Sequence, residues 1–364
     1  MAIYGKKVVI IAILIACNFA VLSSASESIR VAVADNQKTV VLKSSMGLVL
    51  EGARRGRVEK KMVFGSGYAG TGPVRVLSDD GLVQVNGRSY RGTVEVRKKK
   101  NGALLVVNEL GIEDYLMGVI AAEMPHDWEP EALKAQAVVA RTFALHEKKA
   151  AGRRPYHILA TVNGQVYSGR LGERQASVRA VRETRGLVLT YAGEVIPAFY
   201  HSSCGGHTED ALELWSIDAP YLKGVDCDCQ KISKYGAWER RFSLASFASA
   251  LRTRGYRLQG ITGVKTGSVT PAGRVRDVEV VCDNGTMSVP AEHLREAIGY
   301  NQVPSIFFET EVSGQEVVIS GRGRGHGVGL CQWGAKTLAQ EGYDYRSILR
   351  HYYPGTLLTQ LGDQ

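Results

Sequence analysis

The stretch Tyr115-Leu-Met-Gly-Val-Ile-Ala-Ala-Glu123-Met-Pro125 decides how the fold is interpreted, because it places one acid at the end of an apolar run. Pro125 ends any helix here, since the residue before a proline is pushed out of the α region. A carboxyl among apolar neighbours loses hydration on ionising, so we expect a raised pKa for Glu123. Such a carboxyl can donate a proton near pH 7, for example to a glycosidic oxygen. The alternative is a structural carboxylate that caps the turn at Trp128.

Residues 129–151, directly after this turn, carry the strongest helical pattern of the chain. Pro130 suits a first helical turn, and small or apolar residues recur at helical spacing. Lys134 and Arg141 are seven residues apart, so they fall on nearly one line of the helix surface. Beside Glu123 they are candidates for binding an acetamido or carboxylate group of a substrate. The alternative is a solvated stripe of charge.

The fold class that the patterns predict is α+β. Short alternating runs separated by Asn-Gly pairs at 86–87 and 101–102 indicate β-hairpins in the first part of the chain. Helical and strand patterns mix after it. The predicted organisation is a β-rich N-terminal lobe at 26–108, a mixed α/β core at 109–229, an inserted second lobe at 230–320 and a closing segment at 321–364 that completes the core.

Residues 1–25 are predicted to be an export signal, with Lys6 and Lys7 before an apolar run too short to span a membrane. Two processing alternatives compete. Leu14-Ile-Ala-Cys17 resembles a lipobox that would lipidate Cys17, whereas Ser23-Ser-Ala25 resembles an ordinary cleavage site and is favoured because the chain stays apolar beyond the cysteine. Either way we expect the protein in the periplasm or cell envelope, with membrane contact only through the signal or a lipid anchor.

The charge balance narrows the function classes. The formal net charge is +9, and it falls to +7 without the two lysines of the predicted signal. A moderately basic exported protein suits an anionic partner such as a cell wall. Nucleic acid is not an expected partner, because the basic clusters are scattered and no nucleic-acid motif accompanies them.

The glycine-rich run Gly321-Arg-Gly-Arg-Gly-His-Gly-Val-Gly329 is not a phosphate loop, because no Gly-Lys-Ser/Thr leads into the next helix. Alternate glycines instead allow close approach of backbones. His326 at its centre and Gln332 at the start of the following helix are candidates for hydrogen bonds to a sugar hydroxyl or amide. The alternative for His326 is a packed structural histidine.

Five cysteines remain after the predicted signal, and an odd number excludes complete intramolecular pairing. Cys204, His207, Cys227 and Cys229 supply the ligand set of a structural zinc site, with His201 as a spare ligand. The alternative is a disulfide from Cys204 to one of the later pair, which an oxidising compartment favours.

Three blocks of this sequence together resemble the SpoIID/LytB family of bacterial cell-wall proteins. In chain order they are Asp114-Tyr-Leu-Met-Gly-Val-Ile-Ala-Ala-Glu-Met-Pro125 with Ala132-Leu-Lys-Ala-Gln-Ala-Val-Val-Ala-Arg-Thr-Phe-Ala144, Phe199-Tyr-His-Ser-Ser-Cys-Gly-Gly-His-Thr208 with Trp215, and Gly325-His-Gly-Val-Gly-Leu-Cys-Gln-Trp-Gly-Ala335 with His351-Tyr-Tyr-Pro-Gly355. They span roughly residues 108–356.

The resemblance implies a lytic transglycosylase that cuts peptidoglycan glycan strands, often strands stripped of stem peptides, with Glu123 as the catalytic residue. It also implies zinc at Cys204 and His207, because some sporulation members bind zinc near the second block. LytB-like members are described as amidase modifiers, so a non-catalytic wall-binding module that acts on an amidase is the alternative function. The residues expected to line the glycan groove are Lys134, Arg141, Tyr200, His201, Ser202, His326 and Gln332.

A single carboxylate fits this reaction. A glycoside hydrolase needs a second carboxylate to activate water or to attack carbon. Glu113 and Asp114 lie well before Glu123, and Asp127 follows beyond the proline. A lytic transglycosylase uses one residue as acid and then as base, and so needs no second acid.

Overall fold

The computed structural model describes residues 27–51, 59–65, 72–162 and 164–362. The predicted export signal and Cys17 lie outside the described residues. Within the described part, no helix is long and apolar enough to cross a membrane.

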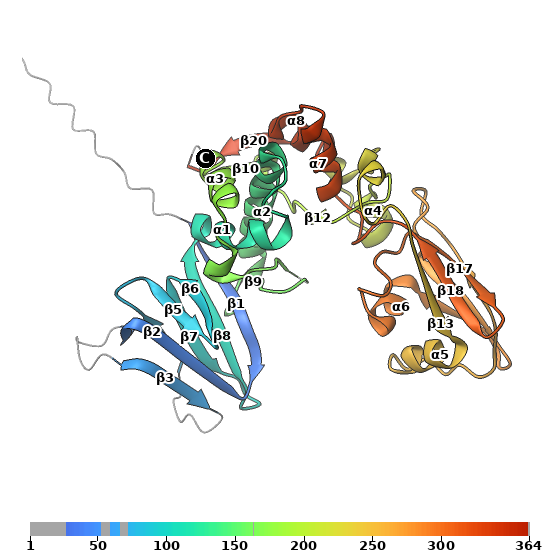
Figure 1. Ribbon diagram of the computed structural model, residues 1–364, viewed down its shortest axis with the longest axis horizontal. Helices are drawn as coiled ribbons and strands as arrows, with labels where there is room; N and C mark the ends of the chain where they lie inside the picture. Colours follow the sequence, from blue (N-terminus) through green and yellow to red (C-terminus); the bar gives the residue numbers. More distant parts are fainter. Residues whose placement is uncertain (1–26, 52–58, 66–71, 163, 363–364) are drawn as a thin grey trace, which may run out of the picture.

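The described chain is a mixed α/β structure, in outline as the sequence predicts (Figure 1). The helices are α1 Ile112–Glu123, α2 Pro130–Ala151, α3 Gln175–Glu183, α4 Ala211–Trp215, α5 Leu244–Arg252, α6 Ala291–Ile298, α7 Gln332–Gln340 and α8 Tyr345–Tyr352. The strands are β1 Ser28–Gln37, β2 Thr39–Leu50, β3 Glu59–Gly65, β4 Val74–Leu77, β5 Leu82–Val85, β6 Arg88–Arg91, β7 Thr93–Lys98, β8 Leu104–Gly111, β9 Ile158–Leu159, β10 Leu187–Tyr191, β11 Glu194–Val195, β12 Tyr200–His201, β13 Trp238–Ser243, β14 Ile261–Thr266, β15 Asp277–Cys282, β16 Gly285–Pro290, β17 Phe308–Ser313, β18 Glu316–Gly321, β19 Leu330–Cys331 and β20 Leu357–Gln360.

A nine-stranded sheet forms the N-terminal part, in the order β6-β5-β2-β4-β7-β8-β1-β9, with β3 on β2. The hairpin predicted at Asn86-Gly87 joins β5 to β6, and both residues have the positive φ, 48° and 88°, that a tight hairpin turn requires. Strand β8 runs directly into α1, so the sheet fixes where the first helix begins.

Helices α1 and α2 lie at the centre of the molecule, where α3, α7 and α8 pack against them (Figure 1). The helix expected at 129–151 is confirmed as α2. Gly118 in α1 permits close packing, because a Cβ there would lie 2.6 Å from the Tyr167 ring. The backbone around Val166 is thereby held beside the last turn of α1.

The chain leaves this central part after β12 and returns at β19, and these two short strands pair in parallel. Between them lie two three-stranded sheets, β13-β18-β17 and β14-β15-β16, which with α5 and α6 enclose a second hydrophobic core. Figure 1 shows this part on the opposite side of the central helices from the N-terminal sheet. The pairing of β12 with β19 brings the second and third sequence blocks together.

Candidate active site and cysteine cluster

Glu123 opens into a cavity of about 540 Å³. The residues that line it include five that the sequence predicts to bind substrate: Tyr200, His201, Ser202, His326 and Gln332. Glu123 is the only carboxylate of that lining in the described structure. The cavity therefore offers a single acid to whatever it binds.

The Glu123 carboxyl is fixed by its backbone surroundings. It ends α1, and the chain turns away at Met124, whose backbone is extended before Pro125. The backbone N–H of Val166 donates a hydrogen bond of 2.7 Å to Oε1. Gln165 anchors that segment, because its amide accepts from the Tyr115 hydroxyl and donates to a backbone carbonyl of α2. The carboxyl thus has a defined orientation.

Burial raises the pKa of Glu123 above its ordinary value of 4.5. The Val166 N–H, Tyr200 and Gln332 oppose the shift because they favour the charged form, but burial outweighs them. The sequence-based expectation of a raised pKa thus agrees in direction with the structure. A protonated carboxyl at the cavity wall is the form that a general acid requires.

Among the described cavity residues, His201 Nε2 has no hydrogen-bond partner, whereas Tyr200 Oη and Gln332 Nε2 lie near the Glu123 carboxyl and favour its charged form without completing a regular hydrogen bond. Buried polar groups are normally paired, because an unpaired one costs about 1–3 kcal/mol. Tyr200 and His201 come from β12 and Gln332 from the first residue of α7, beside β19. One unpaired group and two groups with incomplete hydrogen bonds around one carboxyl indicate a site for a polar ligand.

His326 is held by the protein through both ring nitrogens. Its Nε2 lies 2.9 Å from the Tyr200 carbonyl, and its Nδ1 accepts from the Val328 backbone N–H at 3.1 Å. Burial lowers the pKa of His326 to about 4, so the ring is neutral near pH 7. Only the face of the ring is available to a ligand.

Lys134 and Arg141 are corrections to the sequence-based prediction, because neither lines the cavity. Lys134 forms ion pairs with Glu131 and Glu183, at 2.8 and 2.7 Å, on the surface between α2 and α3. Arg141 is fully buried and donates two hydrogen bonds, 2.9 and 2.7 Å, to the Glu113 carboxylate. The two cations do share one side of α2, but that side faces α1 and α3.

Three aromatic side chains form part of the same cavity wall, and none of them is assigned a role by the sequence-based prediction. Phe143, Phe199 and Trp215 line the cavity. The Trp215 ring lies 4.8 Å from the Phe199 ring and 5.0 Å from that of His326, and the residue is 38% exposed. Trp215 ends α4, whose N-terminus the Asp210 side chain caps. Trp215 is one of the four tryptophans of the chain and lies close to the second sequence block. This was the signal available in the sequence.

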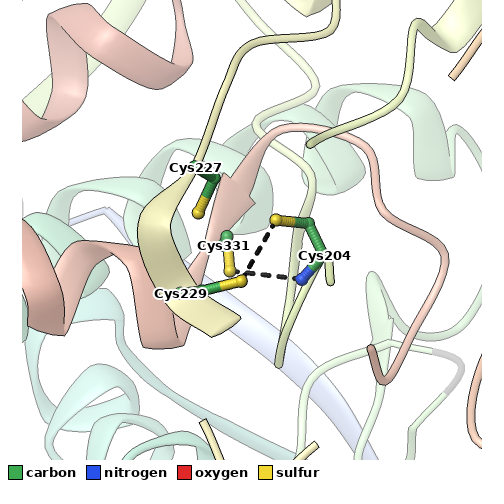
Figure 2. A group of neighbouring side chains, drawn as sticks. All are labelled: Cys204, Cys227, Cys229 and Cys331. Atoms are coloured by element: carbon green, nitrogen blue, oxygen red, sulfur yellow. Dashed lines mark hydrogen bonds between the residues drawn. The ribbon is translucent and has the colours of Figure 1, made fainter. Parts of the chain in front are cut away.

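Four buried cysteines, Cys204, Cys227, Cys229 and Cys331, form a cluster (Figure 2). Their sulfur atoms all lie within 4.8 Å of one another, and the Cys204 and Cys229 sulfurs are 3.4 Å apart. All are free thiols in the described structure. Cys331 Sγ accepts backbone N–H bonds from Cys204 and Gly334, each 3.3 Å long. Four thiols in this arrangement could hold a metal ion.

His207 is a further correction, because Cys331 takes the place in the cluster that the sequence assigned to the histidine. Gly205 and Gly206, with φ of 80° and 120°, turn the chain so that the His207 ring is partly exposed, with Nδ1 at the Thr208 carbonyl. Cys331 is 127 positions from Cys204. The parallel pairing of β12 with β19 helps bring them together.

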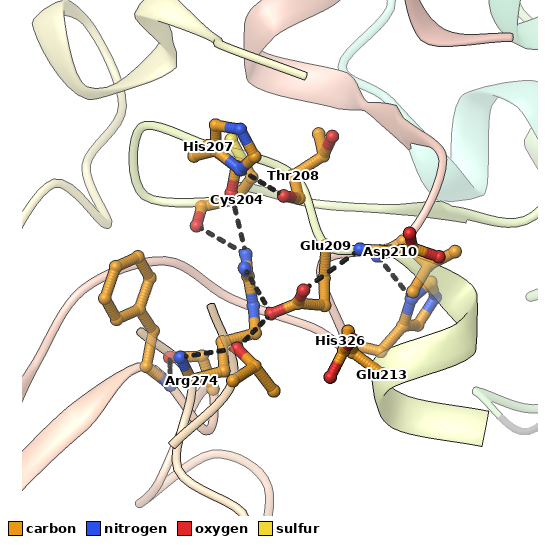
Figure 3. A network of polar contacts seen from close by, with 12 residues as sticks. Cys204, His207, Thr208, Glu209, Asp210, Glu213, Arg274 and His326 are labelled. Atoms are coloured by element: carbon orange, nitrogen blue, oxygen red, sulfur yellow. Dashed lines mark hydrogen bonds and ion pairs between the residues drawn. The ribbon is translucent and has the colours of Figure 1, made fainter. Parts of the chain in front are cut away.

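A buried polar network joins the inserted residues to both sites (Figure 3). Arg274 donates to the carbonyls of Cys204 and His207, at 2.9 and 3.0 Å, and pairs with Glu209 at 3.4 Å. The Glu209 backbone N–H in turn donates to Gly327 at 2.8 Å. Arg274 therefore holds the Cys204 loop against the glycine-rich segment.

Glu123 is expected to make the folded chain less stable as pH rises. Because the folded carboxyl has the higher pKa, the native state keeps its proton longer than the unfolded state. The stability from this proton is present below the unfolded pKa and is lost as pH rises through the folded pKa. Glu123→Gln removes this decline. Urea unfolding of both proteins from acidic to neutral pH measures it, and a difference between them that does not vary with pH would contradict it.

Comparison with known proteins identifies the family of this chain. A family model described as Stage II sporulation protein, SpoIID, matches residues 100–191, which contain α1, Glu123 and α2. Stage II sporulation protein D of Bacillus subtilis is 34% identical over 270 residues, which cover 70% of this chain and 76% of that protein. The chain belongs to the SpoIID family.

Other relatives extend the SpoIID match. The amidase enhancer of Bacillus subtilis is 32% identical over 336 residues, which cover 78% of this chain but 46% of the enhancer. An uncharacterized protein of Brachyspira hyodysenteriae is 34% identical over 282 residues, 76% of this chain and 74% of that protein. A second family model, a domain of unknown function, matches residues 220–329 and so covers the inserted sheets. The resemblance seen in the three sequence blocks is confirmed.

Proposed function

We propose that this SpoIID-family chain is an exported lytic transglycosylase that cleaves the glycan strands of peptidoglycan. The observation that carries the proposal is the single carboxyl, with its pKa raised by burial, in the wall of a cavity large enough for sugar residues. The names of two relatives, a sporulation protein and an amidase enhancer, support a place in the cell envelope.

In the proposed reaction Glu123 acts twice. Its carboxyl first protonates the glycosidic oxygen, and the bond from that oxygen to the anomeric carbon breaks with both electrons going to the oxygen. The 6-hydroxyl of the same muramoyl sugar then bonds to the anomeric carbon, and the Glu123 carboxylate takes the hydroxyl proton. The product is a 1,6-anhydro end, the acid is restored, and no water is consumed.

The cavity residues have matching roles in this proposal. His201 Nε2 is unpaired, and Tyr200 Oη and Gln332 Nε2 lie near Glu123 without a complete hydrogen bond. In this proposal all three would bond sugar hydroxyl or acetamido groups. Ser202 lines the same wall. Since both ring nitrogens of His326 are engaged, this residue would meet the sugar through its ring face, beside Trp215.

The product ends test the reaction directly. We expect the purified chain to release fragments with 1,6-anhydro ends from peptide-free glycan strands, identified by mass spectrometry. Reducing ends would indicate hydrolysis and would require a second carboxylate that the described cavity lining does not contain.

Truncation of the aromatic wall, Trp215→Ala, is expected to raise the KM for glycan strands about three- to tenfold with little change in kcat. The reason is the loss of a stacking face worth about 0.5–1.5 kcal/mol. Trp215→Phe is the matched control and should keep most of the affinity. A fall in kcat at constant KM, with the fold intact, would place Trp215 in the chemical step and contradict this role.

The alternative function is a non-catalytic modifier of an amidase, which the name of the amidase enhancer supports. It predicts glycan binding and stimulation of a partner amidase, with no anhydro product from this chain alone. Nothing in the geometry of the cavity favours it over cleavage.

The cysteine cluster is proposed to hold a structural zinc ion, with Cys204, Cys227, Cys229 and Cys331 as its ligands. Four thiolates form a closed tetrahedral set that leaves no position for substrate or water. Two backbone N–H donors on Cys331 Sγ suit a thiolate ligand. Zinc would hold the Cys204 loop to the start of α7, and the reaction itself needs no metal.

A further inference from the structure

Arg324 is the single lysine or arginine among the described residues that line the Glu123 cavity. Its backbone pairs with Ser203 through two hydrogen bonds, 3.0 and 2.7 Å long. The pairing places it opposite the segment that carries Tyr200 and Ser202. Arg324 therefore belongs to the cavity wall and not to the outer surface of the inserted part.

The guanidinium of Arg324 is held in place by neutral groups. Nη2 donates to the Asn301 side-chain oxygen at 2.8 Å, and the guanidinium lies 5.2 Å from the centre of the Tyr235 ring. Among the described residues no carboxylate lies within ion-pair distance of it. The buried arginines differ, since Arg141 pairs with Glu113 and Arg274 with Glu209.

The other titratable side chains that line the cavity do not neutralise the positive charge of Arg324. Burial keeps the His326 ring neutral and favours the protonated form of Glu123. A guanidinium stays charged at every pH relevant to proteins and presents a planar fork that matches a carboxylate. A fixed positive charge in the wall of a cavity, oriented but without a counter-charge, is complementary to an anionic group on the ligand.

We propose that Arg324 binds a carboxylate of the substrate and is a specificity-determining residue of the site; this inference rests on the proposed function. Two sources on peptidoglycan supply this chemistry. One is the lactyl carboxylate of a muramoyl sugar that carries no peptide. The other is a free carboxylate of a stem peptide. When a stem peptide is attached, the lactyl carboxyl is an amide and has no charge.

Binding measurements in the Glu123→Gln background test the proposal without turnover. The probes are peptide-free glycan strands, the same strands with their lactyl carboxyls converted to amides, and peptide-bearing strands. Arg324→Gln is the test variant and Arg322→Gln the matched control. Arg322 carries the same charge two residues away but is exposed and stacks on Phe307, outside the cavity.

If the lactyl carboxylate is the ligand, Arg324→Gln weakens binding of peptide-free strands roughly ten- to hundredfold, the size expected for a charged hydrogen bond. The amidated strands then bind equally to both proteins. If the stem peptide supplies the carboxylate, the loss occurs with peptide-bearing strands alone. Arg322→Gln changes neither, and Arg324→Lys restores part of the affinity.

Equal weakening for charged and amidated strands, or no weakening for any strand, overturns the proposal. Unchanged thermal unfolding of Arg324→Gln shows that a loss of affinity is not a loss of fold. A different result would contradict the proposed function. Charge-dependent binding through Arg324 without anhydro products from the wild-type chain would remove the transglycosylase reaction and keep Arg324 as a carboxylate receptor.

Discussion

Glu123→Gln is expected to lower the release of anhydro-ended glycan fragments by about 10²–10⁴-fold, the usual contribution of a general acid and base. The amide keeps the shape of the side chain and still accepts the 2.7 Å hydrogen bond from Val166. It cannot give a proton to the glycosidic oxygen or take one from the 6-hydroxyl. The measurement is the initial rate of release from peptide-free strands, followed by mass spectrometry.

Asp127→Asn is the matched control for that experiment. Asp127 lies just beyond Pro125, is exposed and is not part of the cavity lining. It is the acid nearest to Glu123 along the chain, and Asp127→Asn should retain the wild-type rate. Equal rates for wild type and Glu123→Gln would remove Glu123 from the chemistry. Binding without cleavage by both would favour the amidase-modifier function.

Cys331→Ser is expected to abolish metal binding and to lower the free energy of unfolding by several kcal/mol. A ligand present at a thousandfold excess over its Kd stabilises the folded state by about 4 kcal/mol, and a broken cluster loses that contribution. Chelation of the wild-type protein should lower its stability by a similar amount. Metal analysis and urea unfolding, with and without chelator, measure both effects.

Cys282→Ser is the control for the metal experiment. Cys282 is also buried, but it lies in β15 within the second hydrophobic core and outside the cluster. It should keep its zinc and respond to chelator as wild type does. Wild-type protein purified without zinc, with Cys204 and Cys229 joined in a disulfide, would contradict the metal proposal.

The elements that the sequence predicts well are those fixed by local patterns. Helix α2 follows Pro130 and a run of small residues, and the Asn86-Gly87 turn has the positive φ that this pair favours. The position of Glu123 at the end of α1 could also be predicted from neighbouring residues, because the apolar run and Pro125 determine where this helix ends. These features need no knowledge of distant parts of the chain.

The errors arose where tertiary contacts decide. Spacing along α2 aligned Lys134 with Arg141, but it could not show that Glu113 and Glu183 would face them. His207 is close to Cys204 in sequence, whereas Cys331 is distant in sequence and reaches the cluster through backbone pairing such as that of β12 with β19. Arg324 could not be assigned because the absence of a counter-charge is a property of the folded cavity.

The glycines of the third block restrict how this site can evolve. A Cβ at Gly325 would lie 2.8 Å from His201 Cβ, one at Gly327 would lie 2.4 Å from the Arg274 guanidinium, and one at Gly329 would lie 2.1 Å from a backbone carbonyl. Substitution at these alternate positions therefore displaces the Cys204 loop or the Glu123 cavity. Positions 324 and 326 lie between these glycines and already carry side chains, so a change of ligand preference there would leave the close backbone approaches intact.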